Sequence, residues 1–182
     1  IYKVDIFNIK EISTLYYTYL INFYQELQKM FYWDESHCGF KLEKKLQLID
    51  NVKTIFISTA FLSSDGVDIL QKLINKYSVK RENVTVCLSA EFSDDHPSDI
   101  LIALNKIAKV RLAMGNRLFH PKLYYIHGNI DNLLIFGSSN LTVGGFGRNI
   151  EFNSISHPTN EEIIQIENFI SYCHSQTDEL TT

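Results

Sequence analysis

Hydrophobic residues in the first part of the chain recur at intervals of three and four, the spacing of one face of an α-helix. One such stripe covers residues 12–27, and a shorter one covers residues 42–49. The apolar members of the first stripe are Ile12, Leu15, Tyr16, Tyr19, Leu20, Phe23 and Leu27. We therefore expect residues 1–40 to form a helical N-terminal portion, which contains no motif that indicates a function.

From about residue 53 onward, short β-branched or apolar runs alternate with longer amphipathic ones, which predicts alternating strands and helices. The predicted strands cover residues 54–60, 84–88, 109–113, 122–127, 133–136 and 150–155. The predicted helices cover residues 67–77, capped by Ser64 or Asp65, residues 97–108, with Pro97 in the first turn, and residues 161–173.

The order of these elements predicts the fold class. Strands separated by helices indicate parallel pairing, whereas the short polar stretch 128–131 between two strands indicates an antiparallel hairpin. We expect an α/β fold with a mixed β-sheet flanked by helices. A chain of 182 residues has room for one domain with a sizeable core, so residues 1–182 are expected to form a single domain.

Charge is distributed unevenly along the chain, although the net charge is only −4. Residues 1–102 carry 11 basic and 14 acidic side chains, and residues 151–182 carry six acids and no base. Residues 103–150, in contrast, carry six basic side chains against Asp131 alone. This basic segment either attracts an anionic partner or forms a solvated surface, and charge alone does not decide between the two.

The three cysteines, Cys38, Cys87 and Cys173, show no spacing typical of disulfide frameworks, so we expect a reducing, cytoplasmic location. The pairs His37–Cys38 and Cys173–His174 lack zinc-ligand spacing, and we expect no metal and no cofactor. The longest early uncharged run, residues 12–25, is too short and too polar to span a bilayer, so no membrane partner is expected.

Candidate chemistry is concentrated in residues 119–153. Residues two apart on a strand point to the same side, so His120 and Lys122 are expected to project together. Two potential cations make a poor core arrangement, because burying them without partners is costly. A phosphate would satisfy both: Lys supplies charge and donors, and His can attack phosphorus or donate a proton.

The stretch Gly137-Ser-Ser-Asn140 ends the next predicted strand, which is the hairpin partner of the strand that carries Lys122. Its Ser and Asn side chains can hold a phosphoryl oxygen. Glu151 is expected on the following strand, within reach of the His120 imidazole, where a carboxylate would fix the tautomer. Between them, Gly144, Gly145 and Gly147 predict a flexible loop that borders the site.

His-Pro-Lys followed by Gly-Ser-Ser-Asn-Leu-Thr, Gly-Gly-Phe-Gly and Asn-Ile-Glu resembles the phospholipase D superfamily. The chain looks most like the single-motif nuclease branch, which includes metal-independent type II restriction endonucleases. The motif-bearing resemblance covers residues 119–153, and the strand–helix alternation from about residue 53 is similar to the α/β layout of that family.

The resemblance implies a role for each matching residue. It implies His120 as the nucleophile, Lys122 and Asn140 as phosphate ligands, and Glu151 as the partner of His120. It also implies Ser138, Ser139 and Asn149 as phosphate-binding or supporting residues. The family pattern has an acid five residues after the Lys, where this chain has His127, which we interpret as a turn residue.

The resemblance further implies a metal-independent phosphodiesterase that cleaves DNA, or RNA, through a phosphohistidine intermediate. A second histidine must protonate the leaving group, and because the chain has one His-x-Lys we expect a homodimer with a shared site. Arg117, Arg148, Lys109 and Arg111 are the candidate nucleic-acid contacts. The alternatives are a lipid phosphodiesterase of the phospholipase D type and a catalytically silent nucleic-acid-binding or dimerisation module.

Overall fold

The computed structural model describes residues 30–33, 45–46, 49–90, 97–113, 115 and 117–181. Its strands are β1 (Met30–Trp33), β2 (Val52–Thr59), β3 (Val84–Ser89), β4 (Lys109–Ala113), β5 (Leu123–Gly128), β6 (Asn132–Gly137), β7 (Phe152–Ser156) and β8 (Asp178–Glu179). Its helices are α3 (Ser64–Tyr77), α4 (Pro97–Ile107) and α5 (Asn160–Ser175), with two short helical segments, η1 (Arg81–Asn83) and η2 (Gly144–Arg148).

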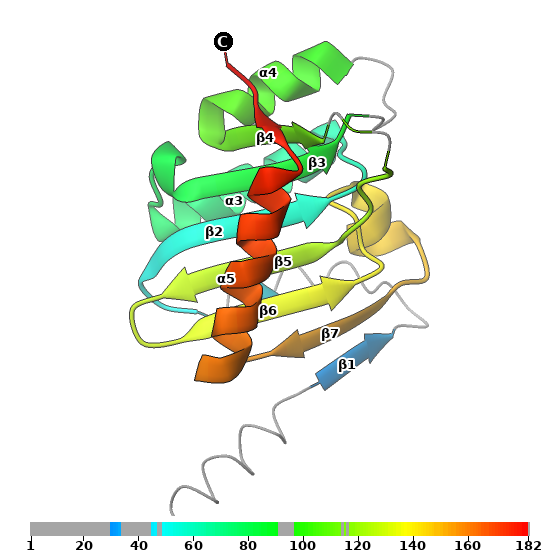
Figure 1. Ribbon diagram of the computed structural model, residues 1–182. Coiled ribbons are helices and arrows are strands. Elements are labelled where there is room, and N and C mark those ends of the chain that lie inside the picture. The colour runs from blue at the N-terminus through cyan, green and yellow to red at the C-terminus, as the bar shows by residue number, and fades with distance from the viewer. Residues whose placement is uncertain are drawn as a thin grey trace, which may run out of the picture.

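The strands form one sheet in the order β1-β7-β6-β5-β2-β3-β4-β8. Strands β2, β3 and β4 are parallel, and β5, β6 and β7 continue the sheet in antiparallel pairs. The mixed sheet expected from the sequence is confirmed. Because β5 and β7 run against β2, the chain enters β5 and β7 at the same edge at which β2, β3 and β6 end (Figure 1).

Alternating side chains of the central strands pack against helices on both sides of the sheet. Ile55 and Ile57 of β2 belong to the larger core, which α3 and α4 close. Phe56, between them, belongs to a smaller core beneath α5. Figure 1 shows α5 crossing the face of the sheet opposite to α3. Apolar side chains on both faces explain why β2 reads as a continuous hydrophobic run instead of an alternating one.

Several predicted boundaries need correction. Helix α3 is capped by Ser63, whose side chain accepts a hydrogen bond from the Gly66 amide, and not by Ser64 or Asp65, which lie in the first turn. Strand β7 begins at Phe152, so Glu151 precedes the strand on which it was expected. Within the N-terminal portion 1–40, which was expected to be helical, Met30–Trp33 form strand β1 instead. The rest of that portion, with the predicted helix 12–27, and most of the predicted helix 42–49 lie outside the described residues.

The glycine-rich segment after Asn140 is the short π-type helix η2 and not the flexible loop that the sequence indicated. Its Phe146 side chain is 4% exposed and packs edge-on against the ring of Tyr124. Gly145 lies so close to Asn140 that an added Cβ would overlap the Asn140 carbonyl oxygen. The glycine therefore serves close packing against the candidate site, because only a residue without a side chain fits there.

Candidate active site

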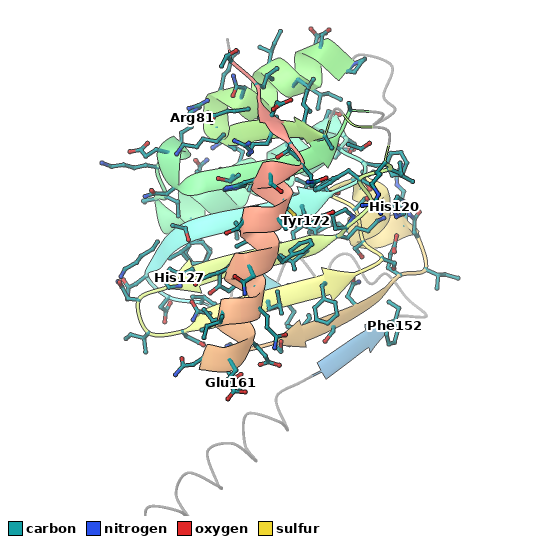
Figure 2. The ribbon with its side chains drawn as sticks, viewed as in Figure 1. Arg81, His120, His127, Phe152, Glu161 and Tyr172 are labelled. Carbon is teal, nitrogen blue, oxygen red and sulfur yellow. The ribbon has the colours of Figure 1, made fainter. Side chains whose placement is uncertain are left out.

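His120 and Lys122 lie in the segment directly before β5. This segment is at the edge of the sheet at which β2, β3 and β6 end, as Figure 2 shows for His120. We call it the catalytic edge, because it carries the candidate catalytic residues. The Lys122 Nζ donates a hydrogen bond to the His120 carbonyl oxygen at 2.9 Å. The same Nζ lies 2.6 Å from the His120 Nδ1 and 3.1 Å from its Nε2, so the ammonium group contacts the imidazole. The structure therefore brings the two side chains together, as the period of two along an extended chain predicted.

The electrostatic surroundings of Lys122 include the Glu151 carboxylate. Partial burial lowers the pKa of the Lys122 ammonium below its ordinary value, and the negative charge of Glu151 partly opposes this shift. A carboxylate near an ammonium favours the charged form. Glu151 thus helps to maintain the positive charge of the Lys122 side chain, which is the charge needed to attract a phosphate.

Asn140 follows β6 and contacts the end of β2. Its Oδ1 accepts hydrogen bonds from the backbone amides of Ala60 and Phe61, at 3.2 and 3.1 Å. Because two backbone donors hold the oxygen, the orientation of the side-chain amide is fixed. Its nitrogen retains donor capacity, which suits a phosphoryl oxygen.

Glu151 is 7% exposed, which is unusual for a carboxylate. Its Oε1 accepts a hydrogen bond from the Asn149 side-chain amide at 3.1 Å, and its Oε2 accepts a short hydrogen bond from the Ser138 hydroxyl. Ser138 in turn accepts a hydrogen bond from the Phe152 backbone amide at 2.9 Å. The predicted residues Ser138, Asn149 and Glu151 therefore form one hydrogen-bonded group, whereas the direct partnership of Glu151 with His120 stays a prediction.

Ser139 is fully buried, with 0% exposure, and is placed beneath the site. Its hydroxyl accepts a hydrogen bond from the Asn153 side-chain amide at 2.8 Å, and its carbonyl accepts one from the Tyr124 hydroxyl at 2.9 Å. Of the two roles considered for Ser139, phosphate binding or support, this placement fits support.

Three further side chains form hydrogen bonds that support the candidate site and were not identified from the sequence: Thr59, Tyr124 and Asn153. Burial raises the pKa of the Tyr124 hydroxyl well above its ordinary value, and the charge of Glu151 adds to this effect. Tyr124 therefore stays protonated and remains a hydrogen-bond donor. Tyr124 lies two positions after Lys122, and Asn153 lies two after Glu151, so the period of two was the available signal. Thr59 gave no such signal.

The four candidate nucleic-acid contacts fall into two groups. Arg117 precedes His120 in the same segment, Arg148 ends η2, and both are exposed. Arg111 instead binds the end of α5 and Thr177 after it: its Nε donates to the Thr177 hydroxyl at 3.0 Å, and its guanidinium also donates to the backbone carbonyls of His174 and Thr177. Arg111 is therefore committed to internal contacts.

Lys109 begins β4 at the opposite edge of the sheet, because β4 is parallel to β2 and ends at the catalytic edge. The structure therefore brings neither Arg111, which makes internal contacts, nor Lys109 to the candidate site, and the nucleic-acid contacts of all four residues stay predictions. Charge counted along the chain does not say on which side or edge of a sheet a side chain lies.

His127 lies at the edge opposite His120 (Figure 2). It belongs to strand β5, paired with Thr54 and Asn132, so the interpretation as a turn residue is wrong. Its Nδ1 is 2.6 Å from the Asn132 Oδ1, a contact across the hairpin. Within the described part of the chain, no group of three or more His, Cys, Asp or Glu side chains could hold a metal ion. The same residues include no helix that is long and apolar enough to cross a membrane. His37 and Cys38 lie outside them.

Solved structures share this fold. The Nuc protein from Salmonella typhimurium, described as a phospholipase D family member, has a TM-score of 0.63 at 15% identity, over 84% of this chain and 100% of that one. NucT from Helicobacter pylori has a TM-score of 0.58 at 15% identity, over 83% and 100%. Phosphatidylserine synthase from Haemophilus influenzae has a TM-score of 0.58 at 13% identity, over 84% and 40%.

By sequence, no curated protein matches the chain at a significant level. A family model matches instead: "Cardiolipin synthase, PLD-like domain", over residues 46–171. This range contains the sheet from β2 to β7 and all the residues of the candidate site. The chain therefore belongs to the family of phospholipase D-like domains.

Proposed function

We propose that the protein is a metal-independent nuclease that cleaves a phosphodiester through a phosphohistidine intermediate. The observation that carries this proposal is the convergence of His120, Lys122, Asn140 and Glu151 at the catalytic edge. The Lys122 ammonium contacts the imidazole, the charge of Glu151 acts on Lys122, and Phe61 contacts both His120 and Asn140. These groups provide a nucleophile, a cation and a fixed amide donor in one place.

In the proposed first step, a nitrogen of the unprotonated His120 ring attacks phosphorus, and the bond between phosphorus and the leaving sugar oxygen breaks. The leaving oxygen takes a proton from a second histidine. Water then attacks phosphorus and gives its proton to that second histidine, and the phosphorus–nitrogen bond breaks. Lys122 and Asn140 stabilise the negative charge on the equatorial phosphoryl oxygens during both steps.

The second histidine comes, in this proposal, from a second copy of the chain. A two-fold axis at the catalytic edge would place the two His120 side chains on either side of one phosphorus. Two apolar side chains beside the motif residues support such an interface: Leu118 is 66% exposed and Ile150 is 92% exposed. A second copy of the chain that approached the motif residues would cover these apolar side chains.

Nucleic acid is the proposed substrate, with DNA as the first candidate and RNA as the alternative. Arg117 and Arg148 are exposed next to motif residues, and Lys122 adds a positive charge beside His120. Side chains of this kind bind a phosphate backbone independently of its sequence. Cleavage at a defined DNA sequence, as in restriction, is the narrower form of the proposal. We also propose a cytoplasmic location and a single domain over residues 1–182.

The mechanism is tested with single- and double-stranded DNA, RNA and dispersed phospholipid, each with and without excess EDTA. We expect nucleic acid to be cleaved equally in EDTA, and the protein to acquire an acid-labile, base-stable phosphoryl label from a ³²P-labelled strand. A His120→Ala protein should acquire none. Magnesium-dependent cleavage would contradict the mechanism, cleavage of phospholipid alone would favour the lipid enzyme, and binding without cleavage would favour the silent module.

The shared site is tested by mixing. Wild-type protein and His120→Ala chains are mixed in varying ratios at a constant total concentration, under conditions in which subunits exchange. If both histidines act on one phosphorus, activity falls with the square of the wild-type fraction, because mixed dimers lack either the nucleophile or the acid. A linear decrease would mean that each chain acts alone.

A further inference from the structure

Phe61 lies outside the motif but contacts two of its residues. The Phe61 and His120 rings are perpendicular, with centroids 6.3 Å apart, and the Phe61 backbone amide donates to the Asn140 Oδ1 at 3.1 Å. Its side chain is nevertheless 37% exposed. Building on the proposed nuclease function, we propose that Phe61 binds the substrate by stacking on an unpaired base next to the phosphate that His120 attacks.

The backbone around Phe61 is held firmly, so the exposed ring has a defined position. Its neighbours Ala60 and Leu62 are each 1% exposed, and Leu62 forms an isolated parallel bridge with Leu141. The Thr59 hydroxyl donates to the Phe61 carbonyl at 2.9 Å. These contacts join the segment between β2 and α3 to the residues after β6. An aromatic ring on a rigid support, beside the nucleophile, is suited to bind a flat partner.

The chemistry of the edge selects the kind of partner. Lys122 provides a positive charge beside the nucleophile. Arg117, three residues before His120, and Arg148, three residues before Glu151, are both exposed, which suits a polyanionic strand. Cationic side chains combined with an aromatic ring are the usual elements of single-strand binding, because every base has a face that can stack. In an intact duplex these faces are covered by neighbouring bases. The inferred substrate class is therefore a nucleic-acid strand that is single or locally opened at the scissile phosphate.

The test compares two single-stranded oligonucleotides that differ only in the bases next to the cleaved phosphate: one has normal bases and the other has abasic sugars there. The enzymes are the wild type, Phe61→Leu, which keeps an apolar side chain against His120 but has no aromatic face, and Phe61→Trp. Tyr172→Ala is the matched control, because Tyr172 is an aromatic residue of α5 with 52% exposure. KM and kcat are measured separately.

We expect the wild type to bind the normal strand with a KM about ten- to a hundredfold lower than that of the abasic strand, the size of typical base–aromatic stacking. Phe61→Leu should reduce the ratio of the two KM values to about one, Phe61→Trp should restore the wild-type ratio, and Tyr172→Ala should keep it. If Phe61→Leu raised KM by the same factor for both strands, the inference about Phe61 would be overturned and the proposed nuclease function would stand. No cleavage of either strand by the wild type would overturn the inference together with the proposed nuclease function.

Discussion

The side-chain amide of Asn153 makes two hydrogen bonds to Ser139, one residue before the amide donor Asn140. Its Oδ1 accepts from the Ser139 backbone amide at 3.3 Å, and its Nδ2 donates to the Ser139 hydroxyl at 2.8 Å. Both residues are almost completely buried, at 1% and 0% exposure. Asn153 on β7 therefore fixes the chain that follows β6, and with it the position of Asn140.

Replacing Asn153 with Ala should lower both stability and activity. The change leaves the buried Ser139 amide without its acceptor, which costs about 1–3 kcal/mol. We expect a lower Tm and a reduced kcat in the remaining folded protein, measured by thermal unfolding and by cleavage at a temperature well below the transition. Asn129→Ala, in the exposed turn between β5 and β6, is the control. An unchanged Tm would show that water replaces the amide without loss.

Gly145 and Gly147 provide a matched pair within η2. A Cβ at Gly145 would overlap backbone atoms of Asn140, whereas a Cβ at Gly147 would meet no atom within 4 Å. We expect Gly145→Ala to destabilise the protein by about 1–3 kcal/mol and to reduce cleavage, because η2 or Asn140 must move. Gly147→Ala should keep wild-type activity and stability. If the two variants had the same free energy of unfolding in denaturant and the same cleavage rate, η2 would be able to move away from Asn140 at no cost.

The Lys122 ammonium should lose its proton at a lower pH than an ordinary lysine, whose pKa is 10.5, because partial burial disfavours the charged form. Glu151 opposes this shift, so Glu151→Gln should lower the pKa of Lys122 further. A titration followed by NMR of the Lys122 Cε measures both values, and Glu161→Gln, on the exposed side of α5, serves as the control.

The pH at which cleavage declines on the alkaline side should shift in the same direction as the pKa of Lys122. Since the charged ammonium is needed for phosphate binding, activity in Glu151→Gln should be lower overall and should decline at a lower pH than in the wild type. A higher pKa of Lys122 in this variant would contradict the electrostatic role given to Glu151.

Changing Arg117 and Arg148 together to Ala should weaken the binding of DNA and flatten its dependence on salt. Each lost phosphate contact reduces the slope of log K against log salt by about 0.7–0.9. The control is the double variant Lys72→Ala with Lys106→Ala, which removes two exposed charges from α3 and α4. Binding isotherms at several salt concentrations decide the matter: equal slopes for the two double variants would remove Arg117 and Arg148 from the interface.

Local patterns in the sequence were sufficient for the fold class and for the centre of the site. The period of two placed His120 and Lys122 side by side, and the hairpin around residues 128–131 brought Gly137–Asn140 next to them. Both results depend on neighbours along the chain, where strand geometry and turn chemistry act directly. The placement of the helix cap at Ser63 and the start of β7 at Phe152 were missed by one or two residues, since adjacent polar residues satisfy the same patterns.

Other features were decided by long-range packing. Phe61 and Asn140 are 79 residues apart, and they meet because β2 is inserted between β5 and β3 in the sheet. Ser139 differs from Ser138 by one position, yet the first is buried beneath the site and the second binds Glu151. Arg111 is basic like Arg117, but it faces α5 and binds the chain after that helix. The sequence by itself determined which groups are present and which strand neighbours share a side, because these follow from local geometry. Only the tertiary structure decided which of them reach the catalytic edge, because strand order and helix packing are set by burial over the whole sheet.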